Sequence, residues 1–319
     1  MLDRFLLKDS AYYQTYFIDI KANPFVKWVG GKRQIIDEIH DYLPSFIEST
    51  ENLTYIEPFV GGGAVFFSLF PSPNIHKSIL IDNNPILIIT YKAIKNHIDE
   101  FITNLAEYER LYSSFQENER TSFYYQIRDE YNALIKVSNF EEFNQNWIPL
   151  ATKFIFLNRT CFNGLYRVNS QGEFNVPIGS YVNPKICDSD NLFHVHKALQ
   201  KTDIFHGDFE IAKKYISSSS FVYLDPPYRP LSSSSFTSYT KTDFDDNEQK
   251  RLANFCDRIN ELGGKFLLSN SDPKNSDPDD NFFDTLYSKY HIERINARRN
   301  INSNGNDRGA VSELLIMNY

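Results

Sequence analysis

Apolar residues along the chain follow two alternating patterns. Ile35, Ile39 and Leu43 recur at helical spacing before Pro44 ends the segment, and a second helical pattern covers residues 252–262. Short apolar runs of strand length lie between such segments, at residues 55–56, 79–81, 221–224, 265–268 and 314–317. Strands that alternate with helices predict an α/β fold, in which helices cover both faces of a sheet.

The middle of the chain departs from this alternation. Residues 92–158 form charged, aromatic-rich helical segments without a single glycine. From Cys161 to Tyr181, glycines stand among polar and aromatic residues, which is typical of a hairpin with loops. We therefore predict three parts: an N-terminal extension (1–22), an α/β domain in two pieces (23–91 and 201–319), and an inserted, mostly helical domain that carries a hairpin (92–200).

The composition and charge of the chain exclude several classes of protein. The chain has 319 residues, of which 41% are hydrophobic and 23% charged, so it is long enough for a large core. Its apolar runs are too short to span a bilayer, and the first residues lack the features of a secretory signal. The formal charge of −8 argues against coating nucleic acid over the whole surface, although a local basic cleft is compatible with it. The three cysteines have neither disulfide nor zinc spacing, which favours the reducing cytoplasm, and the short apolar runs give no reason to expect a membrane partner.

A glycine-rich turn follows the first predicted strand. Residues 58–63 read Pro-Phe-Val-Gly-Gly-Gly, and Asp82 ends the next strand 19 residues after Gly63. Glycines let a ligand approach the backbone, and a helix N-terminus favours negative charge. A carboxylate at the place of Asp82 suits ribose hydroxyls. The alternative is a packing turn followed by a helix-capping aspartate.

A second motif, Asp225-Pro226-Pro227-Tyr228, follows four apolar strand residues. Ligands of open α/β sheets bind at the carboxyl ends of strands, and two prolines fix the directions of the carbonyls in the turn. A carboxylate, a fixed carbonyl and an aromatic ring together can hold a planar heterocycle that carries an amino group. The alternative is a proline-rich turn with a tyrosine in the core.

A third motif precedes the first helix. Residues 25–32 place Trp28 and Lys32 around two glycines. Lys32 could meet a carboxylate and Trp28 could pack on a ligand, but for this segment on its own a structural tryptophan and a solvated lysine are the favoured explanation.

Taken together and in this order, the three motifs resemble the Dam-type DNA adenine-N6 methyltransferases. Further segments match the motifs of that family: residues 158–159, 162–167, 172–177, 207–209 and 302–305. The resemblance extends from Phe25 to Tyr319, and it is closest to GATC-specific methylases of restriction-modification systems. It implies a Rossmann-like methyltransferase sheet and an inserted target-recognition domain.

The resemblance also implies a cofactor, S-adenosylmethionine, and no metal. Its binding residues would be Trp28, Lys32, Phe59, Gly61, Gly63, Asp82, Asp208, Phe209 and Asp225. In catalysis, Asp225 and the Pro226 carbonyl would accept hydrogen bonds from the adenine amino group. Because that group lies inside the duplex, the base must be flipped out, and Tyr228 would stack on it.

Double-stranded DNA is the implied partner, with the adenine of GATC as the target. The residues that the resemblance assigns to DNA are Lys27, Arg159, Phe162, Asn163, Leu165, Arg167 and Pro177. Arg167 would read a guanine edge, and the alternative for it is a phosphate contact. A cognate restriction endonuclease is an implied partner of the system, without direct contact.

Other interpretations use the same residues. A methyltransferase acting on a cytosine N4 amine or an RNA base would share the fold, and a DNA-binding module without catalysis is a third alternative. His194 and His196 lack an acidic or cysteine partner at ligand spacing, so no metal site is expected there. The basic residues near the C-terminus form either a phosphate-contact face or a solvated surface: Arg294, Arg298, Arg299 and Arg308.

Overall fold

The computed structural model describes residues 21–32, 35–70, 72–229, 244–297 and 311–319. Almost all of the predicted extension, the 302–305 motif and three of the basic residues (Arg298, Arg299 and Arg308) lie outside these ranges. The chain divides into two compact units. The first unit comprises Met1–Gly31, Gly61–Pro73 and Asp82–Gly207, and the second comprises Lys32–Val60, Asn74–Ile81 and Asp208–Tyr319. The division into domains at residues 92 and 200 stays a prediction.

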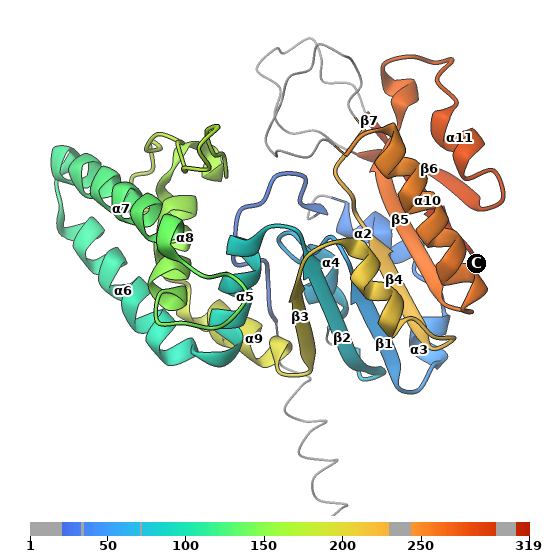
Figure 1. Ribbon diagram of the computed structural model, residues 1–319, viewed down its shortest axis with the longest axis horizontal. Coiled ribbons are helices and arrows are strands. Elements are labelled where there is room, and N and C mark those ends of the chain that lie inside the picture. Colours follow the sequence, from blue (N-terminus) through green and yellow to red (C-terminus); the bar gives the residue numbers. More distant parts are fainter. Residues whose placement is uncertain (1–20, 33–34, 71, 230–243, 298–310) are drawn as a thin grey trace, which may run out of the picture. The chain divides into compact units, whose positions relative to one another are not determined.

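The described strands form one seven-stranded sheet in the order β3-β2-β1-β4-β5-β7-β6, which confirms the predicted α/β fold (Figure 1). The strands are β1 (Leu53–Glu57), β2 (Ile75–Asp82), β3 (Thr202–His206), β4 (Ser220–Leu224), β5 (Lys265–Ser271), β6 (His291–Ala297) and β7 (Val311–Met317). β2, β1, β4 and β5 run parallel, whereas β7 is antiparallel to β5 and β6. Every residue of β4 is buried, as expected for a central strand of a parallel sheet covered on both faces.

The helices of the second unit are α2 (Ile36–Asp41), α3 (Phe46–Ser49), α10 (Asp246–Glu261) and α11 (Phe282–Leu286). α10 packs along β5 (Figure 1). Asp245 caps the start of α10, because its carboxylate accepts hydrogen bonds from the backbone N–H groups of Asn247 and Glu248.

The strand directions decide which residues meet at one edge of the sheet. Asp225 follows the last residue of β4, and Ser269 lies near the end of the parallel strand β5. Because β7 runs the opposite way, its beginning meets the end of β5, with Glu313 in register with Ser271. Asp225, Ser269 and Glu313 therefore lie at the same edge.

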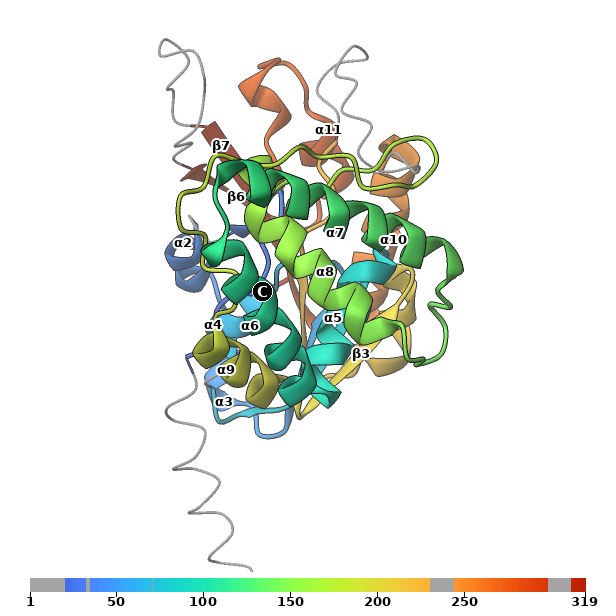
Figure 2. The ribbon, with the colours of Figure 1, turned by 90° about the vertical axis from the view of Figure 1, so that its left-hand side faces the viewer.

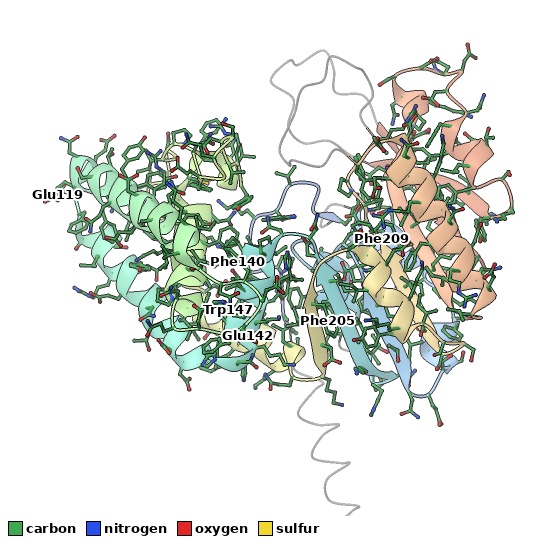
Figure 3. The ribbon with its side chains drawn as sticks, viewed as in Figure 1. Glu119, Phe140, Glu142, Trp147, Phe205 and Phe209 are labelled. Atoms are coloured by element: carbon green, nitrogen blue, oxygen red, sulfur yellow. The ribbon has the colours of Figure 1, made fainter. Side chains whose placement is uncertain are left out.

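The first unit is mostly helical. Its helices are α4 (Ala64–Leu69), α5 (Pro85–Asn96), α6 (Ile98–Ser114), α7 (Glu117–Val137), α8 (Trp147–Thr160) and α9 (Ser189–Leu199). Figure 2 shows α8 beside α5, α6 and α7, and it packs against all three. Glu119, labelled at the start of α7 in Figure 3, closes a capping box with Gln116.

The predicted hairpin follows α8. Antiparallel bridges join Cys161 to Ile178 and Val168 to Phe174. A short 3-10 helix, Phe162–Gly164, forms its first turn. The glycine-rich part of the middle segment thus has the structure that its composition predicts.

Candidate functional site

A buried lysine lies at the centre of a charged cluster in the second unit. The Lys32 side chain is 4% exposed, and its Nζ lies 3.1 Å from Asp225 Oδ1 and 3.2 Å from Glu313 Oε2. Nζ also donates to the Tyr228 hydroxyl and lies 4.4 Å from the centroid of that ring. Lys32 is therefore an ion-pair partner of two carboxylates, which excludes the solvated lysine that the sequence left open.

The Asp-Pro-Pro-Tyr turn is held from several sides. Ser269 donates to Asp225 Oδ1 at 3.1 Å, and the Tyr228 hydroxyl donates to Glu313 Oε2 at 3.0 Å. The buried Gln249 side chain of α10 donates to the Pro227 carbonyl at 3.3 Å. Tyr228 is thus part of a polar network, and the alternative of a core tyrosine in a plain turn does not describe it.

The charges of this cluster depend on one another. Burial raises the pKa of the Asp225 carboxyl, while the neighbouring Lys32 cation lowers it. Burial alone would lower the pKa of Lys32, but Asp225, Tyr228 and Glu313 together raise it. Burial also raises the pKa of Tyr228. The cluster therefore holds a cationic lysine beside a neutral tyrosine at neutral pH.

A second cluster of the same unit contains Asp208 and Phe209. The Asp208 carboxylate accepts two hydrogen bonds from Arg251 of α10, at 2.9 and 2.7 Å, and this guanidinium lowers the pKa of Asp208. Arg251 also lies 4.1 Å from the centroid of the Phe209 ring. Phe209, labelled in Figure 3, packs against Phe59 at a centroid distance of 5.4 Å. The sequence-predicted residues Phe59, Asp208 and Phe209 are thus neighbours.

The glycine turn and Asp82 meet in the first unit. Asp82 Oδ2 accepts the Gly61 N–H at 2.9 Å, and Oδ1 accepts the Asn84 N–H at 2.8 Å. Burial raises the pKa of Asp82, and these backbone hydrogen bonds lower it. Gly61 and Gly63 both have positive φ, at 48° and 71°. The turn has the local geometry that the sequence predicts, with its carboxylate fixed by the backbone.

Trp28 packs directly on this turn. A Cβ on Gly61 would lie 2.9 Å from the Trp28 ring, so that position requires glycine for packing as well as for its φ angle. The Trp28 indole also stacks on Tyr166, with centroids 5.7 Å apart. Trp28 therefore joins the glycine turn to the segment that follows α8.

The residues predicted to contact DNA gather around the hairpin of the same unit. Phe162 is 50% exposed, and its N–H donates to the carbonyl of the exposed Pro177 at 2.9 Å. Asn163 is exposed with a left-handed φ of 55°. Asn175 holds Arg167 by two hydrogen bonds, from Nε at 2.7 Å and from Nη2 at 3.2 Å.

Arg159 and its neighbour Asn158, both in the predicted motifs, form hydrogen bonds to the backbone of the segment before Trp28. The Asn158 side chain accepts the Lys27 N–H at 2.8 Å and donates to the Lys27 carbonyl at 2.9 Å. Arg159 donates to the Phe25 carbonyl at 2.8 Å. The Lys27 side chain packs against Gly164 and donates to the Tyr181 hydroxyl at 3.0 Å. Asn158 and Arg159 thus bind α8 to the segment that carries Lys27 and Trp28.

Leu165 follows Gly164, and its carbonyl accepts from the Cys161 thiol.

The basic residue Arg294 has structural partners. It pairs with Asp272 at 2.9 Å and with Asp284 at 2.8 Å, so two carboxylates occupy the guanidinium that the sequence offered for phosphate. Within the described ranges, no cluster of three or more histidine, cysteine or acidic side chains could hold a metal ion. Among the helices described, none is long and apolar enough to cross a membrane.

Four residues of these clusters had no role in the sequence predictions: Glu313, Ser269, Gln249 and Arg251. Glu313 stands one residue before the predicted last strand, and its charge in an apolar run was the available signal. Ser269 belongs to a Ser-Asn-Ser segment to which no role could be given. Arg251 has no signal in sequence, since its pairing with Asp208 spans 43 residues.

Comparison with known proteins identifies the family that shares this arrangement. Residues 28–301 match the model of the D12 class N6 adenine-specific DNA methyltransferases, which is most of the chain. The chain belongs to this family. The match contains Lys32, the glycine turn, Asp82 and the Asp-Pro-Pro-Tyr motif, so it covers residues of both units.

Individual relatives agree over nearly the whole length. The chain is 46% identical to the type II methyltransferase M.MjaIII of Methanocaldococcus jannaschii, across 94% of this chain and 100% of that protein. It is 36% identical to the type II methyltransferase M1.LlaDCHI of Lactococcus lactis subsp. cremoris, across 94% and 96%. It is 32% identical to the DNA adenine methylase of Escherichia coli K12, across 93% and 95%. The predicted resemblance to the Dam-type family is confirmed.

Proposed function

We propose that this protein transfers a methyl group from S-adenosylmethionine to N6 of adenine in duplex DNA, within the sequence GATC, after flipping the base out of the helix. The observation that carries the proposal is the Asp225-Pro-Pro-Tyr228 turn, held at the edge of the sheet by a buried lysine. A carboxylate beside a rigid carbonyl and a ring suits an exocyclic amine on a planar base.

Each unit, taken by itself, holds residues that suit one part of the cofactor. Asp82 offers a carboxylate whose direction two backbone amides fix, which suits a pair of ribose hydroxyls. Phe59, which is partly exposed and packs on the buried Phe209, offers aromatic surface for a purine, with the exposed Asp208 carboxylate nearby for its amino group. Trp28, Lys32, Gly61, Gly63 and Asp225 complete the proposed set. When bound, S-adenosylmethionine supplies an electrophilic methyl group on a sulfonium, and the protein's residues supply position.

Catalysis by the protein's own groups is mainly positioning. The adenine amine is a poor nucleophile, because its lone pair is delocalised into the ring. Asp225 and the Pro226 carbonyl would accept its two hydrogens, favour tetrahedral character at N6 and direct the lone pair along the line of transfer. Gln249 and Ser269 keep these acceptors in place by binding the turn and the carboxylate. Tyr228 would stack on the base.

DNA recognition would use the hairpin. The exposed Phe162 ring can fill the gap that a flipped base leaves in the stack, with Pro177 beside it. Asn175 orients the Arg167 guanidinium in advance, and a planar fork of this kind suits the O6/N7 edge of guanine. Lys27, Asn163 and Leu165 lie close to this segment in sequence or structure, and we include them in the interface. Arg159, which binds the Phe25 carbonyl, would contribute by holding Lys27 in place.

The experiment is a tritium-transfer assay with labelled S-adenosylmethionine and no added metal. We expect incorporation into a GATC duplex and none into the same duplex methylated at both adenines. Transfer to the methylated duplex would point instead to a cytosine amine, and transfer to RNA alone would point to an RNA base. Cofactor and duplex binding without any transfer would indicate a catalytically silent module.

The relatives also suggest a biological role. Two of them are named type II methyltransferases, so we propose that this chain serves a restriction-modification system in the cytoplasm, with a cognate endonuclease. Purified enzyme that protects GATC sites from a GATC endonuclease would support this role.

A further inference from the structure

Glu313 belongs to none of the motifs that carry the family resemblance, yet it meets two of their residues. It lies in β7, in register with Ser271 of β5 and Ile295 of β6, and its side chain is 17% exposed. One carboxylate oxygen, Oε2, accepts from the Tyr228 hydroxyl at 3.0 Å and lies 3.2 Å from Lys32 Nζ. A single atom thus joins the tyrosine of the Asp-Pro-Pro-Tyr turn to the cation that pairs with its aspartate.

We propose that Glu313 is a positioning residue for methyl transfer, which holds the Tyr228 ring and the Lys32 cation in the places from which they support Asp225. The inference rests on the proposed function and extends it to a residue of the far strand. The ring of a tyrosine can rotate about its side-chain bonds, and a hydroxyl bound at its tip removes that freedom. Because a flipped base would stack on this ring, its orientation determines where N6 lies relative to Asp225.

The second contribution of Glu313 is electrostatic. In the part of the chain that the structure describes, four charged or titratable groups act on Asp225: Lys32, which precedes α2, Tyr223 of β4, Tyr228, and Glu313 of β7. Burial and the Glu313 charge raise the pKa of Asp225, whereas Lys32 lowers it. Asp225 must be ionised to pair with Lys32 and to accept a charge-assisted hydrogen bond from the adenine amine, so its pKa sets the acid side of the pH–activity profile. Replacing Glu313 by an uncharged residue should therefore move the acid limb of the pH–activity profile to lower pH.

Two substitutions separate the contributions. Glu313→Gln removes the charge and keeps an oxygen that can accept from Tyr228, whereas Glu313→Ala removes both. A matched control is Glu261→Gln, since Glu261 is 62% exposed and forms an ion pair with Arg258, a neighbour on its own helix. For each variant, kcat and KM are measured on an unmethylated GATC duplex across the pH range, and thermal unfolding reports the folded fraction.

We expect Glu313→Ala to lower kcat by at least about tenfold, the loss that corresponds to one hydrogen bond to a charged group, while KM for DNA changes little. Glu313→Gln should retain more activity, with its acid limb at lower pH than in the wild type. Glu261→Gln should match the wild type.

Wild-type kcat in Glu313→Ala would overturn the inference. The inference would also be overturned if the loss of kcat in each variant matched its loss of folded protein and the acid limb of the pH–activity profile did not move in Glu313→Gln. Glu313 would then be a structural residue only. If the wild-type protein itself methylates no adenine, the proposed function fails and this role fails with it. Normal wild-type transfer beside unaffected Glu313 variants refutes the role of Glu313 alone.

Discussion

Replacing Lys32 by methionine tests the electrostatic account of the candidate site. The substitution keeps an unbranched side chain of similar length and removes the cation between Asp225 and Glu313, whose side chains are 20% and 17% exposed. Two carboxylates then face each other with their shared partner gone. Removing one partner of a fully buried ion pair costs about 3–5 kcal/mol, and water reaches both carboxylates here, so we expect a loss of about 2–3 kcal/mol at neutral pH.

The loss should depend on pH in a defined direction. Lys32 lowers the pKa of Asp225, so its removal lets burial raise that pKa further above the value in the unfolded chain. A carboxyl with a raised folded-state pKa destabilises the fold when it is ionised and ceases to do so once it is protonated. The destabilisation by Lys32→Met should therefore be full at about pH 8 and shrink toward about pH 5.

The assay is urea denaturation of wild type and variant at both pH values. Lys153→Met is the matched control, because Lys153 is 14% exposed and pairs with one carboxylate, Glu130, which is 43% exposed. That control should lose about 1 kcal/mol or less. A Lys32→Met loss no greater than that of the control, or one that does not shrink as the pH falls, would refute the reasoning.

Three further predictions concern the glycine turn, the cofactor and the hairpin. Gly61→Ala should destabilise the protein by about 1–3 kcal/mol in urea denaturation, because its Cβ would meet Trp28 at a positive φ, whereas Gly172→Ala, with φ of 80° and nothing within 4 Å, should incur only the backbone strain. Asp82→Ala should weaken S-adenosylmethionine binding by roughly 1.5–3 kcal/mol in calorimetry, and unchanged affinity would remove Asp82 from the site. Arg167→Ala should relax discrimination at one base pair by about 1–3 kcal/mol in a survey of substituted duplexes, whereas uniform weakening with a flatter salt slope would indicate a phosphate contact.

The sequence predicted the fold where local patterns determine it. The apolar runs of β1, β2, β4, β5 and β7 are short, buried and bounded by turns, so their strands could be assigned from sequence. β3 and β6 were not predicted as strands. Both are partly polar edge strands, Thr202–His206 and His291–Ala297, and they form only by pairing with a neighbouring strand.

The site shows the same limit. Gly61, Asp82 and the residues from Asp225 to Tyr228 stand next to strand ends, so a rule about the edges of parallel sheets was enough to single them out. Glu313 reaches Lys32 only because β7 is antiparallel to β5, a choice that no local pattern reveals. The sequence indicated that Lys32 could meet a carboxylate. It did not indicate that there are two, Asp225, 193 residues away, and Glu313.

The most direct test of the central claim is single-molecule sequencing of DNA from cells that lack adenine methylation of their own and express either this chain or Asp225→Ala. We expect N6-methyladenine at GATC on both strands with the wild-type chain, and none with Asp225→Ala, provided that both proteins accumulate in folded form. Methylation at another motif would contradict the assigned specificity. Methylated adenine that persists with Asp225→Ala, or modified cytosine in its place, would contradict the proposed site and its chemistry.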